Sequence, residues 1–227
     1  DRALAQAEWV VLYFHGNSGN RKRRDLDCRP FTGHGGHVFL FDYRGYGDNP
    51  GSPNEASLMS DARELWTYIT KDRGVPASRI LLFGESLGGG VATGLSAELC
   101  EAGTPPAGLI LRATFSSLSD VGSHRFPWLP VRWCLFDRFP SVEKIPLVTC
   151  PILQIHGERD RIVPIKFARK LFTAASDHSA SGVSKKFASL RLSGHNDISE
   201  SSFHKFVGEF LLTIRKSFDS ESLRARQ

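Results

Sequence analysis

The stretch Arg79-Ile-Leu-Leu-Phe-Gly-Glu-Ser-Leu-Gly-Gly-Gly-Val91 predicts a buried strand, a sharp turn and a helix that begins at once. The apolar run from Ile80 to Phe83 is too short for a helix and ends at a glycine, as a central strand does. The next five residues match G-x-S-x-G, the nucleophile elbow, whose glycines let strand and helix approach closely. We therefore expect the Ser86 hydroxyl to be exposed at the sheet edge, in front of the free N–H groups of the helix. The alternative is a glycine-rich turn that contains a serine by chance.

The composition favours one globular domain, which we expect to span residues 1–227. Of the 227 residues, 41% are hydrophobic, which is enough for a sizeable core. The four cysteines have no CxxC spacing, so we expect mostly free thiols and no metal site. Nothing in the sequence indicates an oligomeric state.

The net charge of +5 is partly concentrated in the run Arg21-Lys22-Arg23-Arg24. Such runs are usually solvated loops, and a patch for phosphates or anionic lipid is the alternative. The sequence has no nucleic-acid-binding motif, and contact with a membrane surface is compatible with it but not indicated. No apolar run has the length of a membrane span. The residues are compatible with a cytoplasmic location or with membrane association through an N-terminal segment outside this chain.

Apolar runs that predict strands alternate with amphipathic stretches that predict helices. The runs are nearly continuous rather than alternating, which is typical of a sheet covered on both faces. We therefore predict an α/β fold, with a doubly wound, mostly parallel sheet flanked by helices. One helix start is marked by Ser52-Pro53-Asn54-Glu55, with Ser52 as the cap and Glu55 closing a capping box. The expected strands are residues 9–14, 37–42, 80–83, 108–113, 151–156 and 187–192.

A serine nucleophile needs a base, and the base needs an acid that orients it. Asp160 follows the strand at 151–156 and His195 follows the last strand, so both fall on the same sheet edge as Ser86. Their order along the chain is the one that accompanies an elbow serine. Asp160 has a second explanation, as the cap of the helix near Pro164. The rival acids are Glu158, Asp197 and, less well placed, Asp120.

An oxyanion hole needs backbone N–H groups directed at the developing negative charge. We expect one from Leu87 and one from Asn17, with Ser18 as the alternative to Asn17 and an ordinary Gly/Asn turn as the competing explanation. His15 and His156 precede glycines at strand ends, where buried structural histidines are common.

These segments together resemble the α/β-hydrolase superfamily, and within it the ABHD-type branch that includes protein depalmitoylases and serine-aminopeptidase-like hydrolases. The resemblance implies a catalytic triad of Ser86, Asp160 and His195, no cofactor, and hydrolysis of an ester, thioester or amide. The matching segments are Tyr13-Phe14-His15-Gly16-Asn17, Asp42-Tyr43-Arg44-Gly45-Tyr46-Gly47, Gly84-Glu85-Ser86-Leu87-Gly88-Gly89, the stretch from Gly157 to Pro164, and Gly194-His195-Asn196-Asp197.

Two features depart from that family. Only eight residues precede Trp9, so we expect a sheet shortened at its N-terminal edge. The residues before Trp9 also do not contain the cysteine-rich segment that anchors the depalmitoylases to membranes, so we expect an acylated protein to be a less favoured substrate. We expect a serine hydrolase that acts on a small-molecule ester or acyl-thioester, or on an acylated protein. The alternatives are a serine peptidase or amidase of the same fold and a non-catalytic binding protein.

Residues 115–148 interrupt the alternation of strands and helices and are rich in aromatic residues and proline, which predicts a short cap-like excursion. We expect four of its residues to line an apolar substrate pocket. The alternative is that these side chains only pack the excursion onto the sheet. The four are Phe126, Trp128, Leu129 and Trp133.

Overall fold

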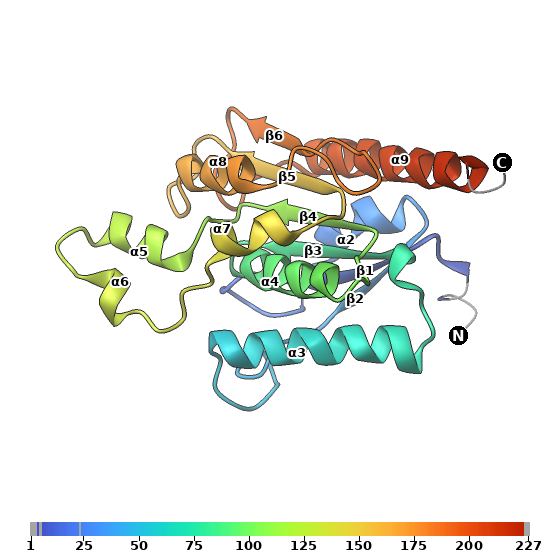
Figure 1. The fold of residues 1–227 in the computed structure, drawn as a ribbon. Coiled ribbons are helices and arrows are strands. Elements are labelled where there is room, and N and C mark those ends of the chain that lie inside the picture. Colours follow the sequence, from blue (N-terminus) through green and yellow to red (C-terminus); the bar gives the residue numbers. More distant parts are fainter. Residues whose placement is uncertain (1–3, 5, 23, 225–227) are drawn as a thin grey trace.

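Six strands form one sheet in the structure, which is a computed structural model that describes residues 4, 6–22 and 24–224. All neighbouring strands are parallel, in the order β2-β1-β3-β4-β5-β6 (Figure 1). The predicted parallel sheet is therefore confirmed. Arg23 of the basic run and the ends of the predicted domain lie outside the described residues. The strands are β1 (Trp9–Phe14), β2 (Gly36–Leu40), β3 (Ile80–Glu85), β4 (Gly108–Arg112), β5 (Ile152–Gly157) and β6 (Lys186–Leu190).

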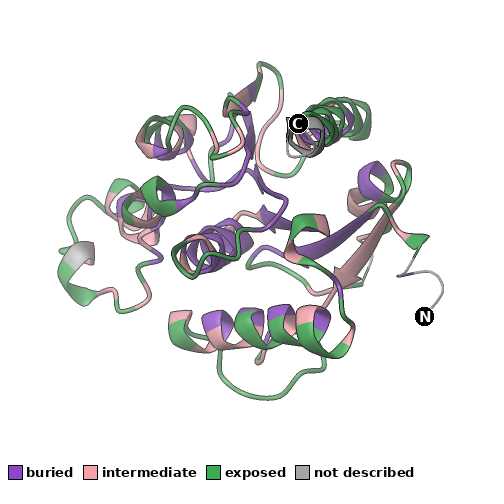
Figure 2. Ribbon diagram, turned by 45° about the vertical axis from the view of Figure 1, so that its right-hand side comes forward, coloured by how far each residue is buried: buried purple, intermediate pink, exposed green. Residues whose placement is uncertain are grey.

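Helices cover both faces of the sheet, as Figure 2 shows. One face packs against α3, α4 and α8, and the other against α2 and α9. Alternate residues of β1 enter the two cores, with Leu12 on one side and Val11 and Tyr13 on the other. The helices are α2 (Asp25–Thr32), α3 (Glu55–Thr67), η1 (Tyr68–Asp72), η2 (Ala77–Arg79), α4 (Leu87–Glu101), α5 (Leu118–Arg125), α6 (Val131–Cys134), α7 (Ser141–Lys144), η3 (Ile145–Leu147), α8 (Ile165–Ala174) and α9 (Glu200–Arg224).

The close approach of β3 and α4 depends on glycine. A Cβ at Gly84 would collide with the backbone of Gly88 and Gly89, and a Cβ at Gly88 would collide with the carbonyl of Phe14. The structure therefore confirms the role expected for the two glycines that flank the elbow. With them in place, the first turn of α4 lies directly behind Ser86.

The cap-like excursion is confirmed between β4 and β5. It contains α5, α6, α7 and η3, and α5 and α6 project from the body at the left of Figure 1. The expected capping box is wrong: α3 is capped by Asn54, whose side chain pairs with Ser57. Glu55 instead accepts hydrogen bonds from the backbone N–H groups of Arg138 and Phe139, at 2.9 and 2.8 Å. Its side chain therefore ties the excursion to the start of α3.

The edge strand β2 is only half-buried along its length. No further strand pairs with its outer side within the described residues. The cysteines are free thiols, as expected. In the same part of the chain, no helix has both the length and the apolar character that crossing a bilayer requires.

Candidate active site

Ser86 lies in a strained turn between β3 and α4. Its φ of 50° and ψ of −113° place a non-glycine residue in a conformation that side chains rarely adopt. The neighbouring strand holds the turn, since the Ser86 N–H donates to the carbonyl of Arg112 at 2.9 Å and Thr114 donates to the Ser86 carbonyl at 2.8 Å. These two hydrogen bonds stabilise the strained conformation of Ser86. The turn directs the Ser86 hydroxyl out of the sheet.

The loops after β3, β5 and β6 bring Ser86, Asp160 and His195 together. The Nε2 atom of His195 lies 3.1 Å from the Ser86 hydroxyl oxygen, and its Nδ1 atom lies 2.7 Å from Oδ2 of Asp160. The loops after β5 and β6 touch at Gly157, where a Cβ would collide with the carbonyls of Ser193 and Gly194. The three side chains form one hydrogen-bonded chain.

Asp160 is buried and its carboxylate has several donors. The N–H groups of Ile162 and Val163 donate to Oδ1 at 2.9 and 2.7 Å, and Nε2 of His156 lies 3.3 Å from Oδ2. Burial alone would raise the pKa of Asp160, but the hydrogen bonds from His156, His195 and Val163 outweigh it and hold that pKa well below its usual range. Asp160 is therefore a carboxylate at neutral pH.

The rival acids contact other groups. Glu158 accepts a hydrogen bond from the Ser189 hydroxyl at 2.9 Å, and Asp197 accepts one from the N–H of Gly194. Asp120 accepts hydrogen bonds from Ser116 at 2.6 Å and from Lys170 at 2.7 Å. Asp160 is the acid for which the structure gives a hydrogen bond to His195.

Asn17 and Leu87 line the cavity onto which Ser86 opens. Neither of their backbone N–H groups donates to another atom of the described chain. The hydroxyl of Tyr46 donates to Oδ1 of Asn17 at 2.5 Å, which restrains the loop that carries this N–H. Ser18, the alternative donor, lines a different cavity. The two N–H groups expected to form an oxyanion hole are thus available beside the serine.

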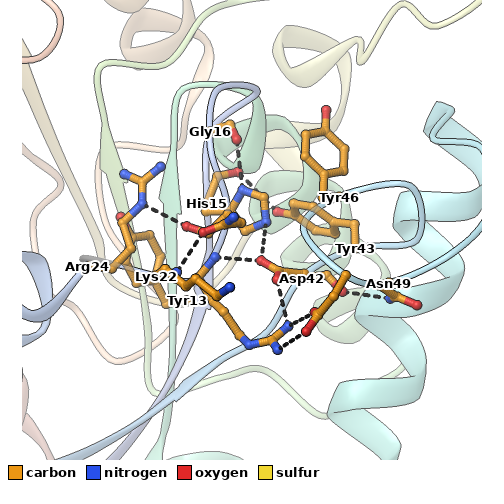
Figure 3. A network of polar contacts seen from close by, with 12 residues as sticks. Tyr13, His15, Gly16, Lys22, Arg24, Asp42, Tyr43, Tyr46 and Asn49 are labelled. Carbon is orange, nitrogen blue, oxygen red and sulfur yellow. Dashed lines mark hydrogen bonds and ion pairs between the residues drawn. The ribbon is translucent and has the colours of Figure 1, made fainter.

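A partly buried network of polar contacts holds the loop after β1 in place (Figure 3). Asp42 accepts hydrogen bonds from the backbone and the guanidinium of Arg21, at 2.5 and 2.6 Å. His15 is fully buried, with Nδ1 2.8 Å from the carbonyl of Gly16. Burial lowers the pKa of His15 more than Gly16 and Asp42 raise it, so its imidazole is neutral. The sequence-based prediction that His15 and His156 are buried structural histidines is confirmed.

An apolar cavity of about 350 Å³ adjoins Ser86. The four residues expected to line such a pocket, Phe126, Trp128, Leu129 and Trp133, are exposed to solvent and are absent from its described wall, so this prediction is wrong. Two segments of the excursion, residues 115–121 and 137–139, contribute to the cavity wall. The four expected residues lie between these segments. The apolar wall consists mainly of Leu87, Phe115, Leu118, Val121, Phe139 and Ile162.

A second, polar cavity of about 320 Å³ is lined by His195, the hydrogen-bond partner of Ser86. It contains an ion-pair network that sequence reasoning missed. Arg112 donates to Asp27 at 2.7 Å and lies 3.1 Å from Glu85, while Arg24 donates to Glu85 at 2.7 Å. Glu85 stood out in the sequence as part of the elbow, but nothing local connects it to α2 or to the end of β4. The remaining lining residues are Ser18, Asn196 and Ile198.

The sequence is similar to that of known hydrolases. A model of the family described as serine aminopeptidase S33 matches residues 5–141. An uncharacterized protein of Mycobacterium tuberculosis is 42% identical over 188 residues, which are 83% of this chain and 63% of the relative. The lysophosphatidylserine lipase ABHD12 of Danio rerio is 36% identical over 203 residues, which cover 82% of this chain and 53% of the relative. This chain thus spans between about half and two thirds of the length of these curated relatives.

Solved structures share the fold. The monoacylglycerol lipase of Paleococcus ferrophilus superposes with a TM-score of 0.66 at 18% identity, over 92% of this chain and 96% of the other. Est1E of Butyrivibrio proteoclasticus, solved with ferulic acid, gives a TM-score of 0.72 at 16% identity, over 91% and 89%. The chain therefore belongs to the serine aminopeptidase S33 family, in the ABHD-type branch of the α/β-hydrolase superfamily.

Proposed function

We propose that the protein is a serine hydrolase that cleaves carboxylic esters of a single apolar acyl chain with a polar alcohol. The observation that carries this proposal is the hydrogen-bonded chain from Ser86 through His195 to the ionised Asp160. The serine of this hydrogen-bonded series, Ser86, has the strained conformation of a nucleophile elbow. These features favour an acyl-enzyme mechanism without a cofactor.

In the proposed mechanism, the Ser86 oxygen attacks the ester carbonyl while Nε2 of His195 takes the hydroxyl proton. The resulting imidazolium is stabilised by Asp160, which also holds Nδ1 in the protonated form. The N–H groups of Leu87 and Asn17 stabilise the oxyanion. When the tetrahedral intermediate collapses, the C–O bond to the alcohol breaks and His195 returns the proton to the departing oxygen. Water then attacks the acyl-enzyme with His195 as base, and the products are the carboxylic acid and free Ser86.

The two cavities support the choice of substrate class. His195 must protonate the departing alcohol, and it lines the polar cavity with Ser18 and Asn196. The apolar cavity contains Ser86 and suits the acyl chain. A single-chain lipid with a polar head group matches this pair of environments. The lipase names of the Danio rerio relative and of the Paleococcus ferrophilus structure agree with this class.

Two other activities use the same mechanism. An acyl-thioester, free or on a protein, differs from an ester in its leaving thiol. A peptidase or amidase is the second alternative, in line with the name of the family. An aminopeptidase needs a carboxylate that is free to pair with the substrate ammonium group. Asp27 and Glu85 in the polar cavity are both paired with arginine, and Asp137 in the apolar cavity accepts the N–H of Glu55 at 2.8 Å. This pairing favours the ester.

The test is labelling and turnover by the whole chain. A fluorophosphonate probe should label the protein, and Ser86→Ala should abolish both labelling and hydrolysis of p-nitrophenyl esters. The exposed Ser201 provides a matched control, since Ser201→Ala should change neither. Labelling that persists in Ser86→Ala would contradict the proposal by showing that another residue is the nucleophile. Wild-type protein that is inert to the probe and to the esters would contradict it in favour of a binding protein.

A second assay compares leaving groups at constant acyl length. Monoacylglycerols and lysophospholipids should be cleaved with higher kcat/KM than the matching acyl-thioester or an aminoacyl p-nitroanilide. A preference for the thioester or for the anilide would replace the proposed substrate class by one of the two alternatives and leave the serine mechanism intact.

A further inference from the structure

The projecting part of the excursion exposes a cluster of large apolar side chains. We call residues 126–136 the cap tip. Trp128, Trp133 and Phe136 have 73%, 86% and 94% of their surface exposed, and Phe126 and Leu129 have 44% and 51%. Most of the projecting end of the excursion is coloured as exposed in Figure 2. Monomeric proteins rarely expose apolar residues in such density, and an exposed apolar cluster is typical of an interaction surface.

The cap tip is connected to the apolar cavity through α5. Val121 of this helix lines the cavity, and the next residue, Gly122, faces Val131 of the cap tip, where an added Cβ would lie 2.8 Å from Cγ1 of Val131. Ile162 also lines the cavity and has 57% of its surface exposed. Apolar surface therefore lies both at the cavity beside Ser86 and on the outside of its cap.

The charge around the cap tip is positive. In the sequence, residues 124–138 include Arg125, Arg132 and Arg138, and Asp137 is the sole acid among them. Asp137 already accepts a hydrogen bond from the N–H of Glu55 at 2.8 Å. Indole rings are favoured at the boundary between lipid tails and head groups, and arginine is attracted to anionic lipid. This combination distinguishes a lipid surface from a neutral protein partner.

We propose that the cap tip docks on an anionic lipid surface. Trp128, Trp133 and Phe136 enter the boundary between head groups and acyl chains. The exposed Arg125 and Arg138 lie at the level of the head groups. Docking requires no hydrolysis, so it stands independently of the proposed function. If both hold, the docked protein has the cavity beside Ser86 close to a surface that contains acyl chains.

Tryptophan fluorescence tests the docking directly, because the four tryptophans fall into two classes. Trp9 and Trp66 are buried, whereas Trp128 and Trp133 are exposed in the cap tip. Ser86→Ala protein is mixed with vesicles of phosphatidylcholine, with and without phosphatidylserine, so that no lipid is hydrolysed. We expect co-sedimentation and a blue shift of the emission with phosphatidylserine vesicles, and weaker binding at high salt.

The matched variants are made in the same Ser86→Ala background. Trp128→Ser combined with Trp133→Ser should lower the partition coefficient about tenfold or more and abolish the blue shift, because the buried tryptophans stay in place. Leu212→Ser, which removes an exposed leucine of α9, should leave binding unchanged. With Ser86 restored, the double variant should hydrolyse a soluble short-chain ester at the wild-type rate, which shows that it is folded.

Three results would overturn the proposal. The first is no co-sedimentation with either kind of vesicle. The second is equal vesicle binding by the parent protein and the double tryptophan variant. The third is a lipid-free dimer in size-exclusion chromatography that the tryptophan substitutions disrupt, since the cap tip would then be a contact between copies of the chain.

Discussion

Oδ2 of Asp160 lies 2.7 Å from Nδ1 of His195, and His156 approaches the same oxygen at 3.3 Å from the strand below. The acid is thus held from two sides, by the loop that contains His195 and by the end of β5. This arrangement orients the His195 ring toward Ser86. Removal of the Asp160 carboxylate charge therefore tests the role of this acid directly.

Asp160→Asn should lower kcat about 10⁴-fold with little change in secondary structure, because an amide leaves the imidazolium of His195 without its charge partner and favours the wrong tautomer. The measurement is ester hydrolysis together with circular dichroism. The exposed Asp177, which pairs with Lys185, is the control, and Asp177→Asn should keep the wild-type rate. A loss of less than about tenfold in Asp160→Asn would show that another group orients His195.

The contact between Tyr46 and Asn17 should affect kcat more than substrate binding. Tyr46→Phe removes the hydrogen bond that restrains Asn17, and a less well-fixed oxyanion donor should lower kcat about tenfold. KM for a p-nitrophenyl ester should change little. Tyr68→Phe is the matched control, because Tyr68 lies in η1, lines neither cavity, and its hydroxyl accepts a hydrogen bond from Arg73. Equal kcat values in Tyr46→Phe and Tyr68→Phe would show that the Tyr46 hydroxyl does not contribute to catalysis.

Val121→Trp should shorten the range of acyl chains that the protein accepts. The larger ring enters the cavity beside Ser86, so kcat/KM for long-chain p-nitrophenyl esters should fall about tenfold or more while acetate esters are hardly affected. Leu129→Trp places the same ring in the cap tip and should leave the chain-length profile of soluble esters unchanged. An effect of Leu129→Trp equal to that of Val121→Trp would show that the cap tip closes onto the cavity in solution.

The ion-pair network predicts loss of stability in acid. Burial would raise the pKa of Asp27, but the hydrogen bond and charge of Arg112 outweigh it and lower that pKa. A lowered folded-state pKa means that the contribution of Asp27 is complete above its unfolded value of about 3.9 and disappears as the pH falls further. The free energy of unfolding, measured with urea, should therefore fall below about pH 4 more steeply in the wild type than in Asp27→Asn.

Removal of the Arg112 guanidinium should lower the free energy of unfolding more than removal of the Asp27 carboxylate charge. Arg112→Met leaves Asp27 and Glu85 as poorly compensated, largely buried carboxylates, and it should cost about 3–5 kcal/mol at neutral pH. The same urea titration at neutral pH measures this cost. A neutral or stabilising effect of Arg112→Met would show that Arg24 and Tyr13 compensate the two acids without it.

Substitutions at two glycines should distinguish the stability cost of a steric collision from the cost of a strained backbone conformation. Gly88→Ala places a methyl group against the carbonyl of Phe14 and should cost more than about 3 kcal/mol, or prevent folding. Gly74 has a φ of +67° and no neighbour within 4 Å, so Gly74→Ala should cost only about 1 kcal/mol and leave activity unchanged. Thermal and urea denaturation of the two variants measure the difference. Similar costs would mean that the elbow relaxes around the added methyl group.

Much of the fold and of the candidate site followed from local patterns in the chain. Short apolar runs bounded by glycine predicted the strands, because buried parallel strands need continuous apolar side chains and sharp turns. The carboxyl ends of parallel strands share one edge, so residues after three strands were expected to meet, and Ser86, Asp160 and His195 do. Their catalytic roles are predictions that the proposed substitutions test.

Other features depend on contacts between distant segments, which local periodicity does not encode. Glu55 has the spacing of a capping box, yet in the folded chain its carboxylate holds the backbone at Arg138 and Phe139. The aromatic residues of the excursion suggested a pocket wall, but an apolar side chain looks the same in sequence whether it faces a cavity or solvent. The elbow around Ser86 was evident from its own residues, since its strain and close packing are local. The apolar cavity, the cavity with the ion pairs and the exposed cap tip arise only when the chain folds. Each is built from residues far apart in sequence or depends on which way a segment faces.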